Sequence, residues 1–173
     1  MTANRFNVFV VGLDDVHLAQ LQALPGALQY RFHALFTSAE LKQQDHFPVP
    51  MLLDEGVRRL EAFPVHIDAV VGYWDFPVST VLPILRRAVG LVTTSLESVL
   101  KCEHKYWSRL IQREVIPDHV PDFAAVDPFL EDALSRPPLP FPFWIKPVKS
   151  VLSHLGFRIS DQDSLQRAIR EIR

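Results

Sequence analysis

The first hundred residues alternate between two hydrophobic patterns, one typical of buried strands and one typical of amphipathic helices. Asn7–Leu13 is largely a β-branched and aromatic run, which predicts a strand buried on both faces. Tyr30–Phe36 and Ile67–Tyr73 are predicted as the second and third strands, and Leu91–Val92 as a short fourth one. Strands of this kind need covering elements on both faces of their sheet.

Helical patterns fill the intervals between these strands. Asp14 is placed to cap a helix through Leu24, which Pro25–Gly26 then stops. The apolar positions of this helix are Val16, Leu18, Leu21 and Leu24.

Three more helices are predicted before residue 90. Thr37–Ser38 is suited to cap a short helix, and a longer one over Leu52–Phe63 follows the proline-marked loop Phe47–Pro50. The next is expected over Pro77–Ala88, with Pro83 kinking or restarting it. The alternation of strands and helices predicts an α/β fold: a doubly wound parallel sheet with right-handed crossovers and helices on both faces.

The pattern changes from residue 95. Hydroxyl residues in Ser95–Ser98 suit the cap of a short helix, and a second amphipathic helix is expected over Lys105–Glu114, ended by Pro117. A short strand is predicted at Phe123–Val126 and a helix near Pro128–Ser135.

The last forty residues predict a hairpin and a helix. Pro137–Pro142 is too rich in proline for a helix or a central strand, so it is expected to be a stiff connector. Phe143–Val148 and Leu155–Ser160 are predicted as the two strands, joined by Lys149–His154. The final helix has Asp161 or Asp163 as its cap and, on one face, Leu165, Ala168, Ile169 and Ile172.

Composition excludes several classes of protein. The 173 residues, 48% apolar and with a net charge of −2, suit one globular domain or slightly more. The single cysteine, Cys102, excludes an internally disulfide-bonded scaffold and a cysteine-built zinc site. No stretch is apolar enough for a membrane span, and Val8–Leu13 is shorter than a signal-peptide core, so a cytoplasmic location is expected.

The charge distribution argues against nucleic acid as a partner. Residues 1–100 carry 7 Lys and Arg against 10 Asp and Glu, whereas residues 101–173 carry 11 against 10. This mild basicity suits a small anionic ligand but not a DNA backbone.

Familiar catalytic and nucleotide motifs are missing from the sequence. Gly12 stands alone after the first strand, so the three-glycine dinucleotide fingerprint is absent, and there is no P-loop. The seven histidines do not pair at helical metal-ligand spacing, and the adjacent Ser153 and His154 do not make a nucleophile–base pair. Tyr73–Pro77 follows the third strand, where open α/β sheets bind ligands; aromatic packing with an aspartate helix cap is the favoured explanation.

Lys146 is the most informative residue because it lies in the otherwise apolar strand Phe143–Val148. Its ammonium group needs a partner, since an unpaired buried charge is costly. It either extends to solvent from an edge strand or reaches ligand phosphates under the polar hairpin loop.

A set of motifs in a fixed order gives this lysine a context. A helix begins near His104–Tyr106, Val115–Pro121 links it to the next strand, and Pro142–Pro147 carries Lys146. A serine-bearing loop, Gly156–Ile159 and a capped helix follow. In this order residues 95–173 resemble the opening of an ATP-grasp ligase domain, and residues 5–92 resemble the Rossmann-like domain that precedes it.

The resemblance implies two domains, a Rossmann-like domain over residues 1–94 and an incomplete α+β ATP-grasp subdomain over residues 95–173. It implies an ATP-dependent carboxylate–amine or carboxylate–thiol ligase acting through an acyl phosphate. Lys105 and Lys146 resemble the two phosphate-binding lysines of the family. Lys149, Ser150 and Ser153 belong to the loop expected to cover the phosphates.

The chain also departs from the family. The covering loop is usually rich in glycine, which allows close approach to phosphates, but here the first glycine is Gly156. The family's adenine-binding segment and Mg²⁺ ligands come later in its order, so they are expected outside this chain. The expected partners are ATP, a small carboxylate, and either a second copy or a missing C-terminal half. The alternative is a non-catalytic α/β interaction module without competent ATP binding.

Overall fold

The structure is a computed structural model that describes residues 5–42, 49–75, 77–150 and 153–173. Phe47 and Pro48 of the expected proline-marked loop lie outside the described residues, as do Phe76 and the loop residues Val151 and Leu152. The chain divides into two compact units, residues 1–99 and residues 100–173, called here the N-terminal unit and the C-terminal unit.

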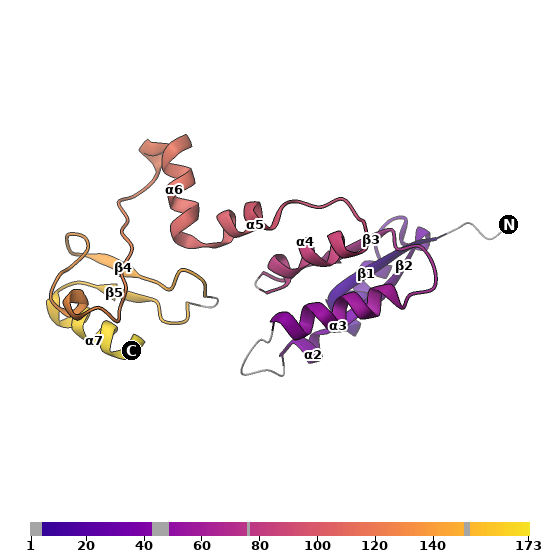
Figure 1. The fold of residues 1–173 in the computed structure, drawn as a ribbon, viewed down its shortest axis with the longest axis horizontal. Coiled ribbons are helices and arrows are strands. Elements are labelled where there is room, and N and C mark those ends of the chain that lie inside the picture. The colour runs from indigo at the N-terminus through magenta and orange to yellow at the C-terminus, as the bar shows by residue number, and fades with distance from the viewer. Residues whose placement is uncertain (1–4, 43–48, 76, 151–152) are drawn as a thin grey trace. The chain divides into compact units, whose positions relative to one another are not determined.

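The N-terminal unit is built on a parallel sheet in the order β2-β1-β3 (Figure 1). In the central strand, Val10 pairs with Ala34 on one side and with Val71 on the other. The elements in chain order are β1 (Phe6–Leu13), α1 (Asp15–Gln22), a 3₁₀ turn (Ala27–Gln29), β2 (Tyr30–Thr37), α2 (Ser38–Lys42), α3 (Val49–Glu61), β3 (Ala69–Gly72), α4 (Val78–Ala88) and α5 (Leu96–Glu103), which crosses the unit boundary.

Helices cover both faces of this sheet, which confirms the predicted α/β arrangement. On one face Phe9 and Val11 of β1 pack with Leu60 of α3 and Leu85 of α4. On the other face the β1 residues Val8, Val10 and Leu13 pack with Leu18 and Leu21 of α1. The continuous apolar run of β1 follows from this position, because every residue from Asn7 to Leu13 is buried.

Helix α1 is shorter than predicted, and fewer of the expected apolar residues are buried. Of its four expected apolar contacts only Leu18 and Leu21 pack on the sheet, whereas Val16 is 66% and Leu24 55% exposed. The helix ends at Gln22, and Gly26 adopts a left-handed backbone with φ +80° just beyond it.

The prediction of a fourth strand at Leu91–Val92 is wrong, and the described sheet has three strands. The Leu91 N–H group donates to the carbonyl of Arg86, and Gly90 has φ +75°, so this segment ends α4 instead. Val92 is 98% exposed and has no apolar surroundings that would favour a strand.

Helix α4 lacks the expected aspartate side-chain cap, and it does not restart at Pro83. It continues through this proline, which is itself buried. Its N-cap is Pro77, and no side chain in the described residues caps it; Asp75 contributes only its backbone carbonyl, which accepts from Ser79. Helix α3 begins at Val49, earlier than the predicted Leu52.

The predicted side-chain caps are confirmed elsewhere. Asp14 accepts from the N–H group of His17 at 2.9 Å, and Ser95 accepts from that of Ser98 at 3.1 Å. Thr37 and Glu40 cap α2 reciprocally: the Thr37 hydroxyl accepts from the Glu40 N–H, and the Glu40 carboxylate accepts from the Thr37 N–H.

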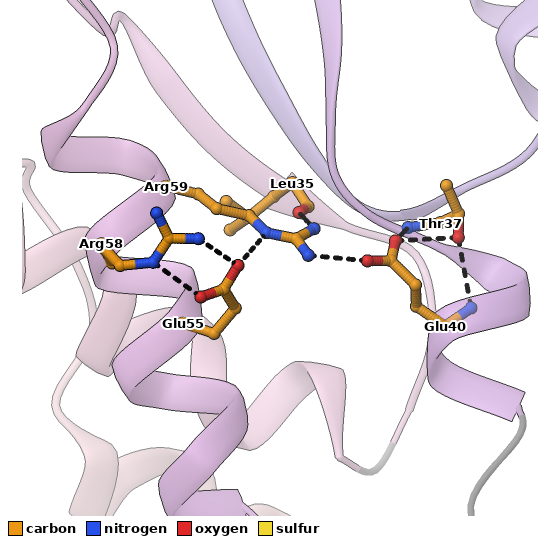
Figure 2. Close-up of polar contacts among 6 residues, drawn as sticks. All are labelled: Leu35, Thr37, Glu40, Glu55, Arg58 and Arg59. Carbon is orange, nitrogen blue, oxygen red and sulfur yellow. Dashed lines mark hydrogen bonds and ion pairs between the residues drawn. The ribbon is translucent and has the colours of Figure 1, made fainter.

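A charged network fastens α2 and α3 to the edge strand β2 (Figure 2). The guanidinium group of Arg59 donates to the Leu35 carbonyl at 2.8 Å and to the carboxylates of Glu40 and Glu55. Arg58 supplies two further hydrogen bonds to Glu55. The hydrogen bonds from Arg58, then from Arg59, lower the pKa of Glu55 to about 2.

The C-terminal unit has a small core between a hairpin and a helix. Phe143, Ile159, Leu165 and Ile169 are its largest buried residues. The elements are α6 (Lys105–Val115), 3₁₀ turns at Pro117–His119 and Glu131–Leu134, β4 (Phe143–Ile145), β5 (Phe157–Ile159) and α7 (Gln162–Ile172), and β4 and β5 are antiparallel.

Several elements of this unit are shorter than predicted. Phe123–Val126 is irregular, because no strand pairs with it in the described chain, and only a 3₁₀ turn forms within Pro128–Ser135. The hairpin is confirmed, but each strand has three residues, so its connection runs from Lys146 to Gly156. Asp161, rather than Asp163, caps α7 through a reciprocal pair of bonds with Ser164.

Candidate functional site

The candidate phosphate site is built around the first turn of α6. His104 precedes this helix, and its Nδ1 accepts from the Trp107 N–H group at 3.3 Å while its ring stacks on the Trp107 ring. Because Nδ1 accepts, the neutral imidazole carries its proton on Nε2. This cap fixes the point at which α6 begins and makes Lys105 its first residue.

Lys105 joins α6 to the connection between β4 and β5. Its backbone N–H group donates to the Val148 carbonyl at 3.0 Å, and its ammonium group donates to the Ser150 carbonyl at 3.2 Å. The first N–H groups of a helix have no partner within the helix, so the Val148 contact satisfies one of them. Two segments far apart in the sequence are thus held together by one residue.

A second lysine of the same connection is paired with a carboxylate. The ammonium group of Lys149 lies 2.8 Å from Oε2 of Glu103, at the end of α5. Both side chains are largely shielded, with 26% of Lys149 and 13% of Glu103 exposed. Dissolved salt therefore screens this pair less than it would screen an exposed one.

The structure therefore brings together three of the five predicted site residues, Lys105, Lys149 and Ser150. Sequence reasoning missed Glu103, which is separated from Lys149 by 46 positions. Its proximity to Lys105 along the chain was visible, but nothing in the sequence indicated which lysine it would pair with.

Lys146 makes a different contact. It follows β4 directly rather than lying within a strand that extends to Val148, and it is exposed. Its ammonium group lies 5.5 Å from the ring centroid of Trp144, a residue that is 61% exposed. Alternation along the strand explains this, because Phe143 points into the core and Trp144 to solvent. The interaction is a surface cation–π contact.

Ser153 belongs to a tight turn before β5. Its carbonyl accepts from the Gly156 N–H group at 3.0 Å, and it has φ +60°, while Leu155 has φ +52°. Residues other than glycine seldom adopt this left-handed backbone. The glycine-poor loop predicted from the sequence thus has two non-glycine residues in conformations that favour glycine.

Neither a metal centre nor a membrane span is found in the described part of the chain. No group of three or more His, Cys, Asp or Glu side chains there is arranged to hold a metal ion. Within the same residues, no helix is long and apolar enough to cross a bilayer. The chemistry of the site is that of two ammonium groups, one carboxylate and loop carbonyls.

Comparisons with known proteins give no match. No protein-family model matches the sequence, and none of the curated proteins or solved structures is significantly similar to it.

Proposed function

We propose that this chain supplies part of the triphosphate site of an ATP-grasp carboxylate–amine or carboxylate–thiol ligase. The reaction of such an enzyme begins when ATP transfers its terminal phosphoryl group to a carboxylate and releases ADP. It ends when an amine or thiol attacks the acyl phosphate and releases phosphate. The role of this chain in that reaction is to bind and orient the phosphates. Lys105 and Lys149 offset their negative charge, and the segment around Ser150 covers them.

The observation that carries the proposal is the contact between the start of α6 and the β4–β5 connection. It places Lys105 against Ser150, with Lys149 in the same connection. Ammonium groups suit phosphate oxygens because charge-assisted hydrogen bonds are short and strong. The donor set therefore fits a polyphosphate. The described residues offer no comparable set of ligands for Mg²⁺, so no step is assigned to the metal.

Binding a phosphate at this place has an electrostatic cost. The carboxylate of Glu103 already neutralises Lys149, and it would repel an incoming anion. A phosphate must therefore compete with Glu103 for Lys149, whereas the ammonium group of Lys105 has, within the described residues, a carbonyl contact alone to exchange. We expect Lys105 to contribute more to phosphate affinity than Lys149.

A second candidate function is a non-catalytic interaction module. The helix α6 supports it, because Trp107, Ile111 and Val115 are exposed at four-residue spacing and therefore share one face. An interaction module also needs no ligand to explain the contact of Lys146 with the Trp144 ring or the ion pair between Lys149 and Glu103.

Isothermal titration of the full chain separates the two candidates. ATP with Mg²⁺ and inorganic tripolyphosphate are titrated separately into the unchanged protein and into Lys105→Ala, Lys149→Ala, Lys146→Ala and the control Lys101→Ala. We expect binding that Lys105→Ala weakens about tenfold, Lys149→Ala less, and Lys101→Ala hardly at all. Absence of binding, or equal binding by Lys105→Ala, favours the interaction module. If Lys146→Ala weakens phosphate binding as much as Lys105→Ala does, the phosphates bind at a site that includes Lys146, contrary to the arrangement proposed above.

A further inference from the structure

A cleft in the N-terminal unit runs along α1 over β1 and β3, and its end at His17 and Tyr73 reaches the carboxyl ends of these strands. The strand order β2-β1-β3 means that the chain leaves β1 towards β2, whereas β3 lies on the opposite side of β1. The carboxyl ends of β1 and β3 therefore flank the point at which the connections diverge, and such a point leaves a crevice in open sheets.

The cleft has a volume of about 380 Å³, within the range of small-molecule sites. Its apolar wall includes Leu21 of α1, Leu24 just beyond this helix and Val71 of β3, and its polar groups come from His17, Gln20 and Tyr73. An apolar wall with a few polar groups is the usual composition of a ligand pocket.

Asp14 determines which ring nitrogen of His17 carries a hydrogen atom. One carboxylate oxygen of Asp14 accepts from the His17 N–H group at 2.9 Å and lies 2.6 Å from the ring Nδ1. The other oxygen accepts from the Ser38 hydroxyl at 3.2 Å. The backbone and side-chain hydrogen bonds from His17 lower the pKa of Asp14, so this carboxylate stays an acceptor. The His17 Nδ1 therefore carries the proton, and Nε2 is an acceptor in the neutral ring.

Tyr73 fixes the plane of this imidazole. The two rings stack with centroids 4.2 Å apart, and the Tyr73 hydroxyl donates to the Gly12 carbonyl at the end of β1. No hydrogen bond to Nε2 of His17 is found within the described residues. His17 thus lines the cleft with its Nδ1 engaged by Asp14, which leaves Nε2 of the neutral ring to accept a hydrogen bond beside an apolar wall.

We propose that this cleft binds a small, uncharged, largely apolar molecule that carries one hydroxyl donor, with Nε2 of His17 accepting the hydrogen bond. The apolar part of the molecule packs against Leu21, Leu24 and Val71. The carboxylate of Asp14, held next to His17, disfavours anions at the same place. This site uses none of the residues proposed to bind phosphate.

Phenol is a suitable probe, because its ring fits the apolar wall and its hydroxyl is the donor. Anisole has the same ring without the donor. Each is titrated into the full chain while amide chemical shifts are followed by NMR. We expect phenol to shift the amides of Leu21, Val71 and Gly72 with a dissociation constant of about 1 mM, and anisole to bind about fivefold more weakly.

The variant His17→Phe tests the acceptor directly, since phenylalanine retains a ring that can stack on Tyr73 but has no nitrogen. It should reduce phenol affinity to that of anisole, whereas His119→Phe, which changes an exposed histidine outside the cleft, should leave it unchanged. Equal binding of phenol and anisole by the unchanged protein overturns the proposal, as does a phenol response confined to other residues. The comparison of phenol with anisole uses the unchanged protein, so its outcome does not depend on whether any variant folds.

Discussion

The two units bury their apolar residues to very different extents. In the N-terminal unit a three-stranded sheet is packed on both faces, and fully buried side chains come from β1, β2, β3, α3 and α4. In the described part of the C-terminal unit there is one small cluster, between the hairpin, one 3₁₀ turn and α7, and helix α6 contains no buried residue. The region that carries the candidate phosphate site is therefore supported mainly by hydrogen bonds and ion pairs, which stabilise less than an extensive core.

The largest difference should come from truncating one leucine in each core. Leu85→Ala and Leu165→Ala each remove a completely buried side chain, and each should cost about 2–5 kcal/mol of unfolding free energy. The smaller core retains less buried apolar packing after the truncation. Leu165→Ala should therefore abolish amide-exchange protection in α7, while Leu85→Ala should leave some protection in α4. Leu28→Ala and Leu130→Ala, at exposed positions, are the matched controls. Protected α7 amides in Leu165→Ala would mean that the two units are equally robust.

Overpacking should have the next largest effect, and only in the N-terminal unit. A Cβ atom at Gly72 would lie 2.3 Å from Cγ1 of Val78, where β3 meets α4. Gly72→Ala should therefore cost about 1–3 kcal/mol in urea unfolding. The double variant Gly72→Ala/Val78→Ala tests the cause: the two effects should be less than additive, because the second change removes the clash. Strictly additive effects would show that the clash with Val78 is not the cause of the destabilisation.

The cap of α7 should have a smaller effect in the C-terminal unit. Asp161→Ala removes the carboxylate that accepts from the Ser164 N–H group, and it should lower the melting temperature of this unit by about 4 °C. Asp163→Ala is the matched control, since Asp163 lies in the first turn but does not cap it. If Asp163→Ala has the larger effect, the cap has been assigned to the wrong aspartate.

The smallest expected difference between the two units is the change in their stability at low pH. Hydrogen bonds from Arg58 and Arg59 lower the pKa of Glu55 from 4.5 to about 2. Burial opposes ionisation of Glu40, but the hydrogen bonds from Arg59 and Thr37 outweigh it, and its pKa is also lowered. A carboxylate with a lowered pKa stabilises the fold above its unfolded pKa and loses this contribution as the pH falls towards the folded value.

The network in Figure 2 should therefore weaken between about pH 5 and pH 2. Urea unfolding followed at pH 7, 5 and 3 should show falling stability of the N-terminal unit, with a shallower fall in Glu55→Gln. An identical pH dependence of the variant and the unchanged protein would show that this carboxylate does not contribute.

Local chemistry explains which parts of the fold could be predicted. Asp14, Thr37 and Ser95 cap helices as expected, because a cap depends only on neighbours within one turn. The first strand was also predictable, since burial on both faces leaves an uninterrupted apolar run. Leu91–Val92 and Phe123–Val126 have suitable strand residues, but a strand also needs a neighbour, and none pairs with them in the described chain.

The candidate site was less predictable because its decisive contacts join distant positions. The motif order drew attention to Lys105, Lys149 and Ser150, but their phosphate-binding role remains a proposal. The pairing of Lys149 with Glu103, and the exposure of Lys146 beside Trp144, depended on where each strand ended.

By itself the sequence determined the alternation of strands and helices, the caps, and the burial of β1, because these follow from residue periodicity and from contacts within a few positions. Only the tertiary structure decided that the sheet stops at three described strands and that Glu103 neutralises Lys149. It also decided that His17 and Tyr73 meet at one cleft. Each of these depends on which distant segments share a surface, and neither periodicity nor local propensity specifies that.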